Sequence, residues 1–495
     1  MPAWQIALSI MATQVSAISL IGAPAFVARR SNGGLKWLQY EFAIPLAMIA
    51  IMWVMVPLYH RIKIITIYEY LERRFGYGMR MIISTVFLFA RGLGSGVALL
   101  ATGIVTAVCV QWPLTETIIF IGIISLVYTT FGGIKADIYS DIIQLFILWG
   151  AAVLSIGIIL NYLGSEGIVF TTSDAFRLNV FEWQTTGLGD GATFSFWAML
   201  IGGFFLYVSY YGADQSQTQR LLATPSAKEA NHALFLNGIL RFPLVLTYLS
   251  FGLLLIPFLN THPHFATTLV GQPADFLVPQ FLIQFVPSGL LGFIIAGIFA
   301  ASMSSLDSAM NSLSAATYQD ILLKWKPGLQ QLNPRTQVRL SRLLTIFWGI
   351  IATLFALWLA GGEETVIELV NKIGSAFYGP IMAIFWLGML NPKTTEKAGI
   401  ISLFMGVLSN IVLWVFFEST VSWLWWNAIG FGITYVSGLL LSRWLPSSVN
   451  SPGELVLTRG DLISIFQKEK RRIFILMGMF LLILIVSAGI ENLLK

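Results

Sequence analysis

The strongest constraint on this chain is a series of long apolar segments spread over nearly its whole length. A helix needs about 20 mostly apolar residues to cross a bilayer. Charged residues make up 11% of the chain and hydrophobic residues 56%, whereas soluble proteins are about 25% charged. We therefore predict an all-α integral membrane protein and exclude a large soluble enzyme. The thirteen runs cover 3–27, 38–58, 79–110, 114–131, 139–162, 193–211, 231–259, 287–323, 341–360, 366–389, 398–418, 422–442 and 473–493.

Basic residues are distributed unequally between the two sets of loops. If residue 1 is cytoplasmic, the loops on that side hold 21 of the 29 lysines and arginines, and the opposite loops hold 5. Because cytoplasmic loops carry an excess of Lys and Arg, we expect a multi-pass protein of the cell (plasma or inner) membrane with a cytoplasmic N-terminus. Thirteen spans then place the C-terminus outside. In a protein that spans the lipid bilayer, basic cytoplasmic loops account for the net charge of +5. We therefore expect no nucleic-acid partner, and no obligatory protein partner is evident.

The first apolar run has polar residues at its middle. Gln14, Ser16 and Ser19 are followed by Gly22 and Pro24. This pattern predicts a broken helix, in which free backbone carbonyls and helix-end dipoles coordinate a cation. The alternative is a continuous helix whose small residues let neighbouring helices approach closely.

The eighth run carries a polar face. Ala301, Ser304, Asp307 and Ser308 recur at helical spacing and share that face. Hydroxyls and carboxylates are hard oxygen ligands, which favour a hard cation over zinc or copper. Asp141, near the start of the fifth run, is either a further acid of this kind or an N-terminal-turn acid stabilised by the helix dipole.

Polar residues inside spans cost free energy and usually serve a function, which favours a transporter. A channel predicts a continuous polar face along several helices, but the polar groups here cluster at mid-span. A membrane enzyme needs a catalytic constellation, and none of the four histidines pairs with an obvious nucleophile. We therefore expect no enzyme activity. A non-transporting solute sensor, which predicts an added signalling domain, is the alternative from a different class.

Several motifs together resemble the sodium:solute symporter family. They are YTTFGGIKA at 128–136, leading to Asp141 and Gln144, SSLDS at 304–308, and DQ at 214–215 before QR at 219–220. The resemblance extends from residue 3 to at least 442. It implies a sodium-coupled secondary active symporter that imports a small polar solute by alternating access, with sodium as its coupling ion.

The resemblance also implies a fold, the LeuT-type 5+5 inverted repeat followed by three C-terminal helices. We assign the first repeat to 1–162, an extracellular loop to 163–192, the second repeat to 193–389 and helices 11–13 to 390–495. Family members usually have one more helix before the first repeat. We expect the natural chain to start upstream of Met1; the alternative is that this helix is absent.

The resemblance implies two sets of sodium ligands. The first site corresponds to Ala12, Val15, Ala301, Ser304 and Ser305. A second sodium, present in some members, corresponds to Asp141, Ser304, Asp307 and Ser308. The alternatives to a second sodium are a single sodium, a proton, or an ion pair between Asp307 and a basic residue such as Lys372.

The residues that the resemblance places at the substrate cavity favour a sugar or sugar derivative. Tyr40-Glu41 resembles a pair in bacterial sugar-transporting members, and a carboxylate can accept bonds from sugar hydroxyls. The alternative substrate is an anionic solute, a monocarboxylate or sialic acid, held by Arg91 or Arg241. Glu41 could instead form a structural ion pair with Lys372 or Arg241, Tyr210 could be core packing, and Arg91 could brace a helix end. The candidates are Gln14, Ser16, Ser19, Glu41, Tyr210, Arg241 and Asn371.

Overall fold

The computed structural model describes residues 1–494 apart from 16, 65, 130–133, 165–166, 361–364 and 446–452. The side chains at 17, 128, 129, 134–138, 140, 300–305, 307 and 330 are also outside the described set. Within the described residues the regular structure is helical, and one isolated β-bridge joins Leu188 to Val421. The prediction of an all-α protein is confirmed.

Eight described helical segments are long and apolar enough to cross a membrane, and ten if each of two bent pairs is one span. The eight segments are Leu35–Ile62 (η1, α3, α4, η2 and α5), α7 (Tyr77–Val110), α9 (Ile134–Leu163, apolar from Asp141), α13 (Ala227–Thr261), α18 (Pro334–Leu359), α21 (Glu396–Phe417), α22 (Trp423–Trp444) and α23 (Arg459–Leu494). The bent pairs are α1 (Ala3–Gln14) with α2 (Ala17–Ala28), and α19 (Val366–Ser375) with α20 (Tyr378–Leu390).

Each of the thirteen predicted runs overlaps a described helix, and three of the runs are not among the candidate spans found in the described residues. Runs 114–131, 193–211 and 287–323 fall on α8 (Leu114–Thr129), α11 (Gly203–Gly212) and α16 (Ser288–Ala316). Their described apolar parts are shorter than 18 residues. Within the described residues, eight to ten spans are therefore supported, and the total of thirteen stays a prediction.

Shorter elements join or extend these helices. Five-residue π-helical turns lie at Ile51–Met55 (η2) and Ala198–Gly202 (η5), and a six-residue one at Thr317–Leu322 (η7). Such turns locally widen a helix and often mark functional regions. The short helices used below are α3 (Leu38–Glu41), α4 (Ala43–Ala50), α12 (Gln215–Leu222) and α15 (Leu277–Phe285), with the 3-10 turn η6 (Ala274–Phe276) before α15.

The first span is broken, as its central polar residues predicted. α1 ends at Gln14, and the helical pair bends by 54° at the break. A second break, of 42°, separates α19 from α20. This one was not expected, because 366–389 is apolar enough to be taken as one continuous span.

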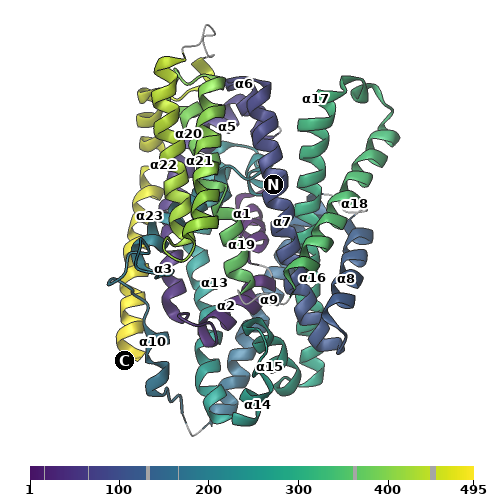
Figure 1. The fold of residues 1–495 in the computed structure, drawn as a ribbon, viewed down its shortest axis with the longest axis vertical. Helices are drawn as coiled ribbons and strands as arrows, with labels where there is room; N and C mark the ends of the chain where they lie inside the picture. Colours follow the sequence, from purple (N-terminus) through teal and green to yellow (C-terminus); the bar gives the residue numbers. More distant parts are fainter. Residues whose placement is uncertain are drawn as a thin grey trace.

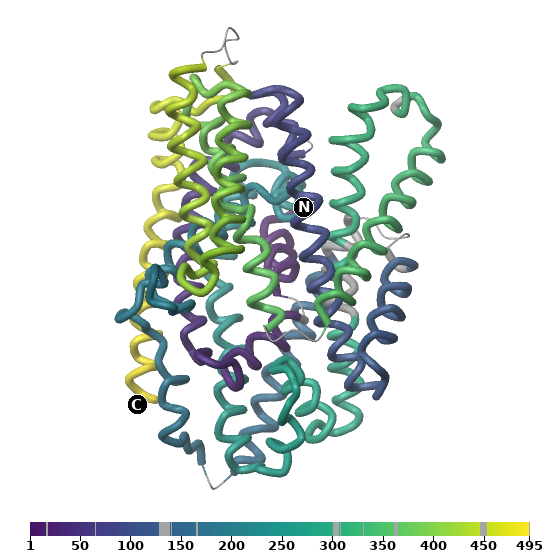
Figure 2. The backbone as a smooth tube through the Cα atoms, viewed as in Figure 1, coloured from purple at the N-terminus to yellow at the C-terminus, as the bar shows by residue number. Residues whose placement is uncertain are grey.

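The broken first span lies in the interior of the molecule. α1 packs against α9 and α13, and α2 packs against α13 and α19. Figure 1 shows the later helices around this N-terminal pair, with α7, α16 and α18 on one side and α20–α22 on the other. The tube view shows the same enclosure of the purple N-terminal segment (Figure 2). The break is therefore held where several helices converge.

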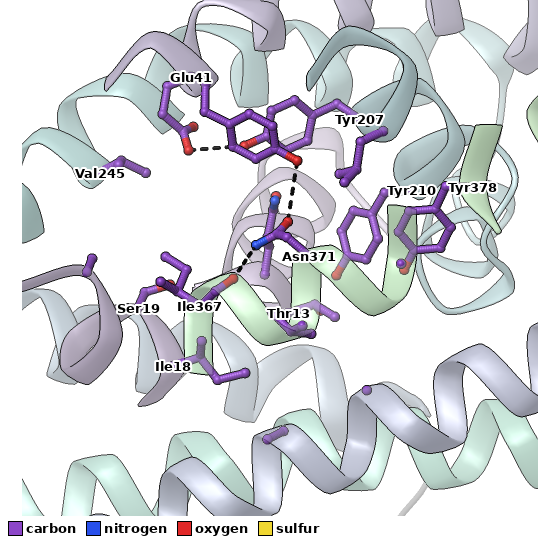
Figure 3. Close-up of a pocket in the computed structure, with 18 of the residues that line it drawn as sticks. Thr13, Ile18, Ser19, Glu41, Tyr207, Tyr210, Val245, Ile367, Asn371 and Tyr378 are labelled. Carbon is purple, nitrogen blue, oxygen red and sulfur yellow. Dashed lines mark hydrogen bonds between the residues drawn. The ribbon is translucent and has the colours of Figure 1, made fainter. Parts of the chain in front are cut away.

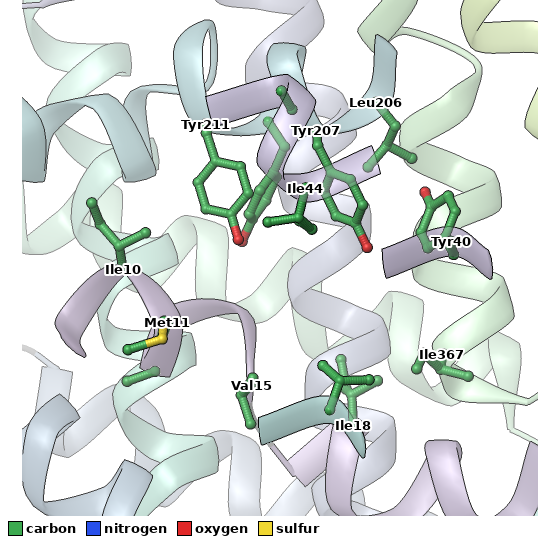
Figure 4. Packing of buried hydrophobic residues seen from close by; sticks show 14 of the residues in the cluster. Ile10, Met11, Val15, Ile18, Tyr40, Ile44, Leu206, Tyr207, Tyr211 and Ile367 are labelled. Atoms are coloured by element: carbon green, nitrogen blue, oxygen red, sulfur yellow. The ribbon is translucent and has the colours of Figure 1, made fainter. Parts of the chain in front are cut away.

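Close helix contacts and apolar packing fix the position of the break. A Cβ on Gly252 of α13 would lie 2.6 Å from the Cα atom of Pro24, so only glycine allows this crossing of α2 and α13. Met11, Val15 and Ile44 belong to the buried apolar cluster around the break (Figure 4). The polar atoms at the break are thus surrounded by a tightly packed apolar shell.

Candidate functional site

A cavity of about 120 Å³ lies beside the break in the first span. Its wall combines residues of α1, α2, α3, α7, α11, α13 and α19. Figure 3 shows Glu41, Asn371, Tyr210 and Tyr378 around this space. Six of the seven candidate substrate residues line the cavity, namely Gln14, Ser19, Glu41, Tyr210, Arg241 and Asn371. The seventh, Ser16, lies outside the described residues.

Glu41 forms a buried ion pair with Arg241. The Arg241 Nε atom donates to Glu41 Oε2 at 2.9 Å, and the Arg241 Nη2 atom lies 3.4 Å from Oε1. The Tyr207 hydroxyl donates to Oε1 at 3.1 Å. The side chains of Glu41 and Arg241 are 1% and 6% exposed. Of the two partners considered for Glu41, Arg241 and Lys372, the structure therefore pairs Arg241 with it. The described contacts of Lys372 include an ion pair with Glu418.

Aromatic and amide side chains form the rest of the polar wall. The Tyr40 hydroxyl donates to Asn371 Oδ1 at 3.5 Å, and the Asn371 amide donates to the Ile367 carbonyl at 2.7 Å. The rings of Tyr210 and Tyr378 lie side by side, with centroids 6.2 Å apart. These residues shape the cavity and leave few unpaired polar atoms in its wall.

Tyr210 and the next residue, Tyr211, have different surroundings. Tyr210 lines the cavity and its hydroxyl accepts a 2.9 Å bond from Gln217. Tyr211 is fully buried and its hydroxyl donates to Gln14. Tyr210, the candidate substrate residue, is thus the one of the two that faces the cavity.

Two arginines in the cavity wall have buried nitrogen atoms without a hydrogen-bond acceptor among the described residues. They are the Nε atom of Arg91, in α7, and the Nη1 atom of Arg241. Arg91 also borders a smaller cavity that contains Asp214. The residues that line the main cavity include these two arginines and one acid, Glu41, so this lining has one surplus positive charge, and Asp214 is the acid nearest to Arg91 outside it. Guanidinium groups with free N–H donors pair well with carboxylates.

The residues of the first sodium site are described only in part. Ala12 and Val15 are buried at the end of α1. The backbone of Val15 is no longer helical, with φ −90° and ψ 88°. The partner positions 301, 304 and 305 lie within α16, but their side chains are outside the described set. The open backbone turn at Val15 suits the coordination of a hard cation by carbonyls.

Asp141, a candidate for the second sodium site, is held in a network around Arg220. The Arg220 Nη2 atom lies 3.0 Å from Asp141 Oδ2 and 2.9 Å from the Ser308 hydroxyl. Its Nε atom donates to Ser9 Oγ at 2.8 Å, and Nη1 donates to the Ser216 carbonyl at 2.6 Å. The Ser9 hydroxyl donates to the same carboxylate oxygen at 2.6 Å.

The network joins α1, α9, α12 and α16 through one buried guanidinium. Its positive charge compensates Asp141 directly. The side chains of Ser304 and Asp307, which complete the proposed second site, are not among the described ones.

Comparison with known proteins identifies the family to which the chain belongs. The model of the sodium:solute symporter family matches residues 1–406. The chain belongs to this family. Its members are secondary transporters that use sodium as the coupling ion, not enzymes, so the recognition from the sequence motifs and the choice of coupling ion are confirmed.

Individual relatives are similar at modest identity. The chain is 27% identical over 464 residues to the sodium/sialic acid symporter NanT of Aliivibrio fischeri, covering 91% of this chain and 87% of the relative. It is 26% identical over 422 residues to sodium-coupled monocarboxylate transporter 2 of Danio rerio, covering 83% of this chain. It spans 64% of the length of that relative.

The fold is similar to that of a solved sodium-coupled sialic acid symporter in a substrate-bound, outward-open state. The TM-score is 0.78 at 24% identity, and the match covers 91% of each chain. The chain is therefore a helical, multi-pass membrane symporter with a LeuT-like fold.

Three contributors to the site were missed at the sequence level. Tyr207 and Tyr378 are aromatic residues in apolar runs, which sequence patterns do not distinguish from core residues. Arg220 was noted in the QR motif but given no role. Its position just after a predicted span, among other polar residues, was the signal that could have suggested a buried polar contact.

Proposed function

We propose that the protein is a sodium-coupled importer of a small carboxylate-bearing solute. The observation that carries this proposal is the cavity wall, in which two arginines face one acid and each leaves a buried N–H without an acceptor among the described residues. A bound carboxylate would pair with the guanidinium groups and balance the surplus positive charge of the lining. The similarity to relatives named for sialic acid and monocarboxylates supports the same substrate class.

A neutral sugar is the second candidate, because Glu41 and Asn371 both line the cavity. It is less well supported, since both oxygens of Glu41 already accept bonds from Arg241 or Tyr207. Sialic acid combines a carboxylate with sugar hydroxyls and fits both sets of residues.

The proposed transport cycle starts when sodium binds at Ala12, Val15, Ala301, Ser304 and Ser305. Sodium holds the broken first helix against α16 and stabilises the outward-open state. The solute then binds beside Arg91, the outer side closes, and both are released inside. Because coupling is reciprocal, the factor by which sodium raises solute affinity equals the factor by which the solute raises sodium affinity.

The finer architecture belongs to the same proposal. It comprises thirteen spans, with inverted repeats at 1–162 and 193–389 joined by the loop at 163–192, and C-terminal helices in 390–495. The N-terminus is cytoplasmic and the C-terminus outside, in the plasma or inner membrane. The excess of basic residues in one set of loops supports this orientation.

Uptake into proteoliposomes tests the proposal. Sialic acid, a short monocarboxylate and a neutral hexose are supplied with an inward sodium gradient or with potassium. We expect sodium-dependent uptake of at least one carboxylate, and an increase in KM of about tenfold or more in Arg91→Gln, because a charge-assisted bond is lost. Arg91→Lys should recover part of this affinity, since it keeps the charge but not the bidentate geometry.

The exposed loop variant Lys393→Gln, which removes a positive charge far from the cavity, is the matched control. Equal uptake in potassium would contradict sodium symport. Hexose uptake that is unaffected by Arg91→Gln, without carboxylate uptake, would favour the neutral sugar.

A further inference from the structure

A second, wider pocket of about 680 Å³ lies on the outside of the helix bundle, between α13 and α23. Figure 1 shows α23 along the outer edge of the molecule. The pocket is separate from the substrate cavity and shares no lining residue with it. It is lined by Lys228, Phe235, Lys468, Glu469, Arg471, Arg472 and Ile475.

The pocket has a surplus of positive charge. Its one acid, Glu469, is buried and already engaged, because it accepts a 3.1 Å bond from Asn231 and forms a 2.7 Å ion pair with Arg472. The other three cations, Lys228, Lys468 and Arg471, are exposed and form no ion pair with a described residue. Three basic side chains thus converge on one hollow without a protein counter-charge among the described residues.

The pocket lies where α23 changes from polar to apolar. Residues 467–472 read QKEKRR, and the apolar run begins at 473. Just beyond the cations, Phe474 and Ile475 are 59% and 42% exposed, and Leu481 is 55% exposed further along the helix. Such side chains suit contact with acyl chains, and the basic residues directly precede the apolar run on the side predicted to be cytoplasmic, where we expect the lipid headgroups.

We propose that this pocket binds the phosphate headgroup of an anionic membrane phospholipid. Lys228, Lys468 and Arg471 contact the phosphate, and Phe235 and Ile475 contact the first part of the acyl chains. Basic pockets between transmembrane helices at this side of a membrane suit such headgroups. A free phosphate would use the cations but would gain nothing from the apolar residues.

Titration of the purified protein in neutral detergent tests the proposal. Phosphatidylglycerol, phosphatidylcholine or inorganic phosphate is added, and the unfolding temperature is followed. We expect stabilisation by phosphatidylglycerol alone. In Lys228→Gln/Lys468→Gln/Arg471→Gln the half-saturating concentration should rise about 100-fold, because each basic residue near the surface contributes about a factor of five.

A second triple variant, Lys393→Gln/Lys397→Gln/Arg443→Gln, removes the same charge from exposed positions elsewhere and should bind phosphatidylglycerol like the wild type. Size-exclusion profiles identify a pocket variant that is misfolded, and Arg471→Lys alone should then retain most of the lipid effect. Equal loss in both triple variants would overturn the proposal in favour of nonspecific charge. Stabilisation by inorganic phosphate at the same concentration would overturn it in favour of a soluble anion.

Discussion

Removing the charge of Glu41 while Arg241 stays in place should destabilise the protein strongly. The two side chains are 1% and 6% exposed, and two guanidinium nitrogens contact the carboxylate. Removing one charged partner of a buried ion pair costs about 3–5 kcal/mol, because the other charge is left buried without a counter-charge. We therefore expect Glu41→Gln and Arg241→Gln each to lower the free energy of unfolding by this amount.

Replacing both partners should cost much less than the two single changes together. In Glu41→Gln/Arg241→Gln no net charge is left in the buried site, and uncharged replacements of buried pairs are often nearly neutral. Because the single variants are expected to cost about 3–5 kcal/mol each, a nearly neutral double variant gives a coupling energy of about 6 kcal/mol or more in the double-mutant cycle. The Tyr207→Phe control removes only one hydrogen bond to Glu41 and should cost about 1 kcal/mol.

Reversible unfolding in mixed micelles, followed by circular dichroism, measures these free energies. The reasoning is refuted if both single variants lose less than about 1 kcal/mol and their effects simply add. In that case the pair is broken or hydrated in the native protein, and Glu41 would be available for substrate hydroxyls.

Three further predictions concern sodium and pH. Ser305→Ala should raise the sodium concentration for half-maximal uptake without changing the amount of protein in the membrane; unchanged sodium dependence would remove Ser305 from the site. If a second sodium binds near Asp141, Asp141→Asn should lower the cooperativity of sodium and the sodium-to-solute ratio given by reversal potentials. A 1:1 ratio in both proteins would exclude that ion. Burial raises the pKa of Asp275, in η6 of the loop before α15, from 3.8 to about 7, and nearby Glu368 adds to the shift. Because a raised pKa favours the protonated folded state, the contribution of Asp275 to stability should be fully present below about pH 4 and should be lost as the pH rises through about 7. Asp275→Asn should flatten this decline in the unfolding temperature.

The positions of the helices were predictable because the bilayer imposes a local rule. Each spanning segment must be apolar and satisfy its own backbone hydrogen bonds, so every predicted run overlaps a described helix. The break after Gln14 was predictable from polar residues at mid-span. The break between α19 and α20 was not predicted, because the run 366–389 was interpreted as one continuous span.

The members of the site were easier to predict than their contacts. Polar residues at mid-span drew attention to Gln14, and the family resemblance drew attention to Glu41 and Asn371; all three line one cavity. The choice of Arg241 as the partner of Glu41, 200 positions away, depends on how α3 and α13 meet. No local pattern encodes this contact, and for the same reason the contact between Arg220 and Asp141 was not predicted.

The network around Arg220 has a consequence for the speed of the transporter. One guanidinium contacts groups on α1, α9, α12 and α16, so these helices cannot separate one at a time without leaving a buried charge poorly satisfied. Separation must break several charge-assisted bonds before water can replace them, which adds activation enthalpy to that step. If these helices part when the inner side opens, turnover should rise steeply with temperature, and Arg220→Gln should flatten its Arrhenius plot while sodium leaks without solute.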